Sequence, residues 1–142
     1  MEKIKLNIDN SEEKSLPSNL EAEQALIGSV LVNNDIIDEI SSIVSSHKFF
    51  DPGHRKIYET IESLNNKGMI ANPITLKNYF ETNSGLAEVG GVDYLVKLTR
   101  FSSSIKQTID YAKIIHEMYV RRELIIISEN VSEESKDNDL KK

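Results

Sequence analysis

Residues 16–35, LPSNLEAEQALIGSVLVNND, contain the features that decide the fold. Ser18 and Glu21 match the S-x-x-E pattern of a helix capping box, and Leu16-Pro17 stands directly upstream. Small and apolar residues then recur at three- and four-residue steps, which predicts an amphipathic α-helix. These residues are Ala22, Ala25, Leu26, Ser29 and Val30.

Two small residues fall in the middle of this predicted helix, Gly28 and Ser29. Glycine in a helix interior costs about 1 kcal/mol relative to alanine, so its presence needs an explanation. A second helix that passes close to this position is the simplest one. We therefore expect a tight helix–helix contact at Gly28.

Helical spacing continues through the rest of the chain. Residues 33–35 end the first helix and cap a second one, and Asp51-Pro52 is a strong helix start. Lys67-Gly68 is expected to stop that helix, Asn72-Pro73 breaks the chain, and Thr75 can cap a short helix. The core residues expected after the first helix are Ile36, Ile37, Ile40, Ile43, Val44, Phe49, Phe50, Ile57, Tyr58, Ile61, Leu64, Leu76, Tyr79, Phe80, Tyr94, Leu95 and Leu98.

A second capping box, S-x-x-Q at Ser104 and Gln107, opens the longest predicted helix, which runs past Ile127 toward Val131. One apolar stripe on this helix has the spacing of an ordinary core face. It consists of Ile109, Ala112, Ile115, Met118 and Tyr119. Further apolar residues extend the surface around much of the circumference, namely Ile114, Val120, Leu124, Ile125, Ile126, Ile127 and Val131.

A helix that is apolar on more than one side must bury more than one side. The extra surface is therefore expected to meet a second helix or another subunit, and the alternative is a central core helix. The candidate subunit or partner interface consists of Ile114, Met118, Tyr119, Arg121, Arg122, Leu124, Ile125 and Ile126.

Together these patterns predict an all-α fold, a compact globule of about six helices that ends in a long helix. Residues 1–15 show no sustained apolar period and predict a disordered leader. The domain itself is expected over residues 16–131, followed by a polar tail at 132–142.

Composition excludes several classes of function. The chain has 142 residues, no cysteine and a net charge of −6, so thiol chemistry is excluded and tight DNA binding by the chain alone is disfavoured. No apolar run is long enough for a membrane span, and the first residues lack the apolar region of a secretory signal. The cytoplasm is the expected location.

A search for catalytic motifs nominates no catalytic, cofactor-binding or metal-binding residue. None of the six glycines is followed by lysine, so the chain has no P-loop for a nucleotide. Gly90-Gly91 is interpreted as a plain turn, and His116-Glu117 lacks the second histidine of a zinc-protease motif because Val120 stands there.

The charged residues are interpreted as solvated helix surface. This applies to the carboxylate pair Glu21 and Glu23. His54 has no neighbouring nucleophile by sequence and is interpreted as a residue of the helix surface or of the N-terminal turn of a helix. A basic stripe on the last helix could instead touch phosphates or an acidic patch of a partner. It consists of Lys106, Lys113, Arg121 and Arg122.

Five motifs in this order resemble the N-terminal domain of the bacterial replicative DNA helicases of the DnaB family. The resemblance covers residues 16–129, and its several coordinated motifs make a chance similarity improbable. The motifs are LPxNLEAEQAxxG (residues 16–28), FxDPxHRxIxxxI (49–61), Thr75-Leu76, VGGxxYLxxL (89–98) and YAxIIxExxxxRxLI (111–125).

The resemblance implies a compact helical globule followed by a helical hairpin, of which residues 111–131 would be the first arm. In the family these domains pair through their hairpins into a collar on the ATPase ring, and the collar offers docking surface to primase and in some systems to a loader. ATP and magnesium bind in the motor domain, which is not in this sequence, so the chain by itself is expected to be no enzyme and to hold no cofactor.

Three functions remain open from the sequence. The first is a non-catalytic module that supports helicase assembly, self-associates and binds primase. The second is a stand-alone regulator that pairs with the intact helicase. The third is one part of a complete ATP-dependent DNA helicase.

Overall fold

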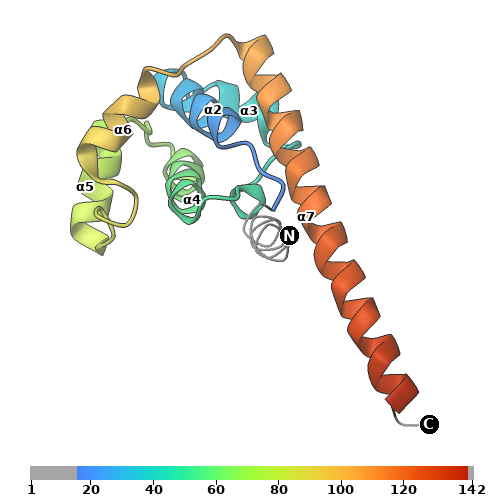
Figure 1. Ribbon diagram of the computed structural model, residues 1–142. Coiled ribbons are helices and arrows are strands. Elements are labelled where there is room, and N and C mark those ends of the chain that lie inside the picture. Colours follow the sequence, from blue (N-terminus) through green and yellow to red (C-terminus); the bar gives the residue numbers. More distant parts are fainter. Residues whose placement is uncertain (1–15, 141–142) are drawn as a thin grey trace, which may run out of the picture. The chain divides into compact units, whose positions relative to one another are not determined.

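The computed structural model of the chain describes residues 16–140, so the predicted leader at 1–15 lies outside the described residues. Six α-helices, one 3-10 helix and no strand are found within 16–140, which confirms the all-α fold (Figure 1). The elements are α2 (Leu20–Val32), α3 (Ile36–Ile40), η1 (Ser46–Lys48), α4 (Pro52–Asn66), α5 (Pro73–Asn83), α6 (Gly91–Thr99) and α7 (Ile105–Leu140).

The chain divides into two units. One unit spans Asn19–His116 and contains α2 to α6 with the beginning of α7. The other contains α7 from Glu117 onward together with the described residues 16–18. Residues 132–140, most of the predicted polar tail, belong to α7, which continues to Leu140. Residues 132–140 contain neither glycine nor proline, so nothing in that stretch stops a helix.

The core of the first unit is built by α2, α4, α5 and α6, each of which contacts the next, and α6 also contacts α2. Phe49 and Tyr58 lie at its centre, with ring centroids 4.9 Å apart. Ala112 and Ile115 of α7 are also buried. Most of the predicted core residues are therefore buried, but Phe50 is only half-buried and Ile43 and Tyr79 pack at the edge of the core.

The close helix contact expected at Gly28 is confirmed. A Cβ atom built on Gly28 would lie 1.9 Å from the carbonyl oxygen of Leu98, the last buried residue of α6. The neighbouring Ser29 hydroxyl donates to the Ala25 carbonyl at 2.7 Å and accepts from the Ser103 N–H at 2.8 Å. Small residues are thus required where α2 meets α6 and the segment that follows it.

The helix starts are partly as predicted. Asp51 caps α4 by accepting from the His54 N–H at 3.0 Å, and Ser104 accepts from the Gln107 N–H at 3.2 Å. The cap of α2 is Asn19 and not Ser18, because the helix begins at Leu20 and only the Asn19 side chain reaches the Ala22 N–H, at 2.9 Å.

The start of α5 also differs from the prediction. Asn72 is the N-cap, and its side chain accepts from the Thr75 N–H at 2.9 Å. Thr75 is the reciprocal partner in this capping box, since its hydroxyl oxygen accepts from the Asn72 N–H at 2.9 Å. Pro73 therefore begins the helix that it was expected to precede.

Gly28→Ala tests the contact between α2 and α6. Alanine favours a helix interior by about 1 kcal/mol, but the Leu98 carbonyl leaves no room for a methyl group, so we expect a net loss of about 2 kcal/mol or more in urea denaturation. Gly68→Ala is the matched control, because a Cβ there meets no atom within 4 Å and only the φ of +74° is unfavourable. A stabilised Gly28→Ala variant would contradict the close approach.

Tyr58→Phe tests an unusual feature of the core. The Tyr58 hydroxyl is buried and has no hydrogen-bond partner within the described residues. Burial raises the pKa of Tyr58, and the nearby Glu62 carboxylate raises it further. Because an unpaired buried hydroxyl costs about 1–3 kcal/mol, its removal should leave the free energy of unfolding unchanged or raise it by about 1 kcal/mol. A loss of stability in calorimetry would indicate a hidden partner such as a bound water.

Candidate functional site

Glu23 was expected on a solvated face, and His54 on a helix surface or in the N-terminal turn of a helix. His54 does lie in the first turn of α4, but both residues are buried and lie against each other. Each is 2% exposed, and Glu23 Oε1 lies 2.8 Å from His54 Nδ1. The surface prediction was wrong because Glu23 shares the inner face of α2 with Leu26 and Ile27, which are fully buried. A polar residue in phase with core positions must find partners inside the protein.

The Glu23 carboxylate is well satisfied by donors from the start of α4. Its Oε2 accepts from the Phe50 N–H at 2.7 Å, and its Oε1 accepts from the Asp51 N–H at 3.3 Å. Because the His54 ring faces an acceptor-only carboxylate, its Nδ1 carries a proton and donates. Removing an ion from water costs several kcal/mol unless hydrogen bonds replace its hydration, and these three donors do so.

Tyr94 extends this arrangement to a third helix. Its hydroxyl forms a hydrogen bond with His54 Nε2 at 2.5 Å and accepts from Gln24 Nε2 at 3.1 Å. The two rings are stacked, with centroids 5.9 Å apart and an interplanar angle of 7°. Burial raises the pKa of Tyr94, the hydrogen bond from Gln24 opposes this, and the Asp51 and Glu23 carboxylates add to the rise.

We call Glu23, His54, Tyr94 and Gln24 the polar network. The polar network joins α2, α4 and α6. As in the catalytic groups of some hydrolases, a carboxylate bonds to one ring nitrogen of a histidine and a hydroxyl to the other, but the likeness ends there. A catalytic base must reach a substrate, whereas His54 is 2% exposed and both of its ring nitrogens are engaged. No group of three or more metal-ligating side chains is found in the part of the chain that the structure describes. The geometry therefore favours a structural role.

The residues of the candidate interface on α7 differ in their exposure to solvent. Arg122 is 8% exposed, and its Nη1 donates to the Pro17 carbonyl at 2.7 Å, so it is not part of an open surface. Arg121 is exposed and pairs with Glu117 at 2.9 Å. Ile114, Met118, Tyr119 and Ile125 are partly buried, and Leu124 and Ile126 are 60% and 43% exposed.

Four exposed apolar residues of α7 fall on one line, which we call the α7 seam. Val120, Leu124, Ile127 and Val131 are 38%, 60%, 54% and 56% exposed. Their spacing of four, three and four residues is that of alternating a and d positions in a coiled coil. The candidate interface named only Leu124 of these four, although the heptad spacing was readable in the sequence. No helix among the described residues has the length and apolar character to cross a membrane.

Fold and site together define a small all-α domain whose polar motif residues join helices and whose last helix exposes an apolar seam. The chain belongs to the family of the DnaB-like helicase N terminal domain, whose family profile matches residues 15–117. Three of the five motifs quoted above, at 16–28, 49–61 and 89–98, supply the polar network.

Relatives of this chain are replicative DNA helicases. The chain is 42% identical over 126 residues to the replicative DNA helicase DnaB of Rickettsia typhi, covering 88% of this chain and 25% of that protein. It is 34% identical over 129 residues to the corresponding protein of Buchnera aphidicola, covering 89% of this chain and 28% of that protein. The chain thus spans about a quarter of the length of these curated relatives.

Two solved structures share the fold. The N-terminal domain of DnaB helicase from Mycobacterium tuberculosis has a TM-score of 0.80 and 26% identity, over 84% of this chain and 86% of that one. A DnaB-like replicative helicase, whose structure was described together with its interactions with primase, has a TM-score of 0.72 and 25% identity, over 83% of this chain and 28% of that one.

Glu23→Ala tests the polar network. It leaves the His54 Nδ1–H and the Phe50 and Asp51 N–H groups without their acceptor, so we expect a loss of about 3 kcal/mol in urea denaturation. Glu21→Ala is the matched control, because Glu21 lies in the same turn but is exposed, and it should cost less than about 1 kcal/mol. Equal effects of the two substitutions would contradict the structural role.

Proposed function

We propose that this chain is the assembly and partner-docking module of a replicative DNA helicase, and that it acts without catalysing a reaction or holding a cofactor. The α7 seam is the observation that carries the proposal. Four large apolar side chains on one helix face are each more than a third exposed. Exposed apolar surface of this kind marks a site of protein–protein contact.

The spacing of the seam indicates what covers it. Apolar residues spaced by four, three and four positions can insert between the side chains of a neighbouring helix, as in a coiled coil. A helix of another subunit is therefore the best candidate to cover the seam. Arg121, Glu117 and Glu123 flank the seam and keep its margin charged. We infer that helicase subunits, including further copies of this chain, pair through α7.

Primase is the proposed partner of the assembled module. This rests on the likeness to the DnaB-like helicase that was studied with primase, which covers 83% of this chain. A helicase loader is a further proposed partner. Direct DNA binding by this chain should be weak, because the net charge of −6 opposes binding to phosphates.

Leu124→Lys tests self-association. A lysine at the most exposed position of the seam places a charge in the proposed contact, so we expect an association constant lower by about tenfold or more in analytical ultracentrifugation. Ser132→Lys is the matched control, since it adds the same charge at an exposed position of α7 outside the seam. Wild-type protein that remains monomeric at high concentration would contradict pairing through α7.

Primase docking is tested by isothermal titration of the chain with primase of the same organism. Saturable binding is expected. Weaker binding of primase to the Leu124→Lys variant would indicate that primase binds the form of the chain that is paired through α7. Failure of primase to bind this chain while it binds the complete helicase would contradict the docking proposal, and it would leave self-association unaffected.

A further inference from the structure

A cleft of about 540 Å³ opens where the start of α2 faces the α6–α7 connection and the first turns of α7. All of its lining residues belong to the unit Asn19–His116, and the α7 seam lies outside that unit. Ala22 and Ala25 of α2 line it with small, buried side chains, which leave the hollow open. Phe101 and Tyr111 line it with aromatic rings, and we call it the aromatic cleft.

The connection that carries Phe101 is held in place against α2. The Phe101 N–H donates to the Leu98 carbonyl at 3.0 Å, and the Ser103 N–H donates to the Ser29 hydroxyl at 2.8 Å. The Phe101 side chain nevertheless stays 39% exposed. Tyr111 is half-buried, and its hydroxyl has no hydrogen-bond partner among the residues that the structure describes. Two aromatic side chains are thus held at an open hollow that they do not fill.

The charge at the aromatic cleft is negative. Of its described lining residues, Glu21 is the one that carries a charge. The charged residues next to lining residues in the sequence do not offset it, because Arg100 and Asp110 have opposite signs and Glu23 is buried against His54. The chain as a whole has a net charge of −6, so its wider field also favours a basic ligand.

Glu21 has no contact that would explain it as part of the fold. The polar residues beside it in the first turns of α2 all have partners, since Asn19 caps the helix, Glu23 holds His54 and Gln24 donates to Tyr94. The Glu21 side chain is exposed and forms no ion pair or hydrogen bond within the described residues. Its carboxylate is therefore available to a ligand.

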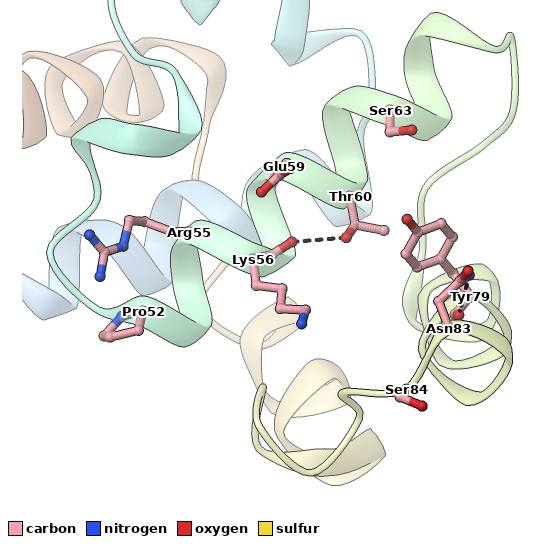
Figure 2. Close-up of a pocket in the computed structure, with 9 residues that line it drawn as sticks. All are labelled: Pro52, Arg55, Lys56, Glu59, Thr60, Ser63, Tyr79, Asn83 and Ser84. Atoms are coloured by element: carbon pink, nitrogen blue, oxygen red, sulfur yellow. Dashed lines mark hydrogen bonds between the residues drawn. The ribbon is translucent and has the colours of Figure 1, made fainter.

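A cleft of about 600 Å³ between α4 and α5 differs from the aromatic cleft in its charge (Figure 2). It is lined by Arg55, Lys56 and Glu59, and Lys56 pairs with Glu88 at 3.2 Å. Figure 2 shows the Arg55 guanidinium pointing away from Lys56 and from the wall formed by Tyr79. The charges of the α4–α5 cleft are balanced and do not converge, whereas the aromatic cleft presents one sign of charge beside two aromatic rings.

We propose that the aromatic cleft binds an arginine side chain of a partner protein. The Glu21 carboxylate can accept two parallel N–H bonds from a guanidinium, and the rings of Phe101 and Tyr111 can stack on its flat faces. Arginine fits better than lysine, because the planar and weakly hydrated guanidinium both stacks on aromatic rings and binds a carboxylate through two donors. The inference deepens the partner-docking function proposed above, and it rests on that function for the existence of a partner.

The proposal is tested by titrating the full chain with the blocked tripeptide acetyl-Gly-Arg-Gly-amide at low salt and following the amide chemical shifts by NMR. We expect saturable shifts at the residues that line the aromatic cleft. Binding should weaken by about threefold or more in Glu21→Gln, which removes the charge, and in Phe101→Leu, which removes the ring and keeps an apolar side chain. Glu39→Gln is the matched control, since it removes an exposed carboxylate outside the cleft and should leave the affinity unchanged.

A peptide with citrulline in place of arginine keeps the shape of the side chain without its charge, and it should bind more weakly by about fivefold or more. The proposal is overturned by the absence of saturable shifts at the cleft, by an unchanged affinity in Glu21→Gln, or by equal binding of the citrulline peptide or of a lysine peptide. Primase is not present in this measurement. A failure of the peptide to bind would therefore leave primase docking untouched, and a failure of primase to bind would leave the peptide result untouched.

Discussion

A carboxylate can be buried only where donors replace its hydration, and the packing of α2, α4 and α6 depends on one such carboxylate, Glu23. It holds the His54 ring and two backbone N–H groups at the start of α4, and the ring in turn meets Tyr94 of α6. This explains why the three motifs at residues 16–28, 49–61 and 89–98 combine specific polar residues with helix signals. They encode one shared set of hydrogen bonds, and they identify the fold without indicating any reaction.

The helices were predictable because their determinants are local. A helix start or stop signal affects only residues within about one turn of it, as do Asp51-Pro52, Lys67-Gly68 and the Ser104 cap. The glycine in the middle of α2 correctly indicated a crossing helix. The exact cap of α2 was not predictable from type alone, since Ser18 and Asn19 can both accept a hydrogen bond. The choice depends on where the first turn of α2 meets the core, which is a property of the folded chain.

The polar network was missed for a different reason. Apolar periodicity assigns core positions by counting apolar residues, so a glutamate on the inner face is treated as surface. The information was nevertheless present, because Glu23 is three residues before Leu26 and four before Ile27, and so lies on the same helix face as both. Arg122 could not be found in this way at all, since its partner is the carbonyl of Pro17, 105 residues earlier in the chain.

The over-wide apolar surface predicted on α7 is divided by the structure into two parts with different physical roles. Ile114 and Ile125 are partly buried, whereas Val120, Leu124, Ile127 and Val131 remain exposed along one line. Apolar contact along a helix contributes affinity but little discrimination between partners, because any complementary helix can cover it.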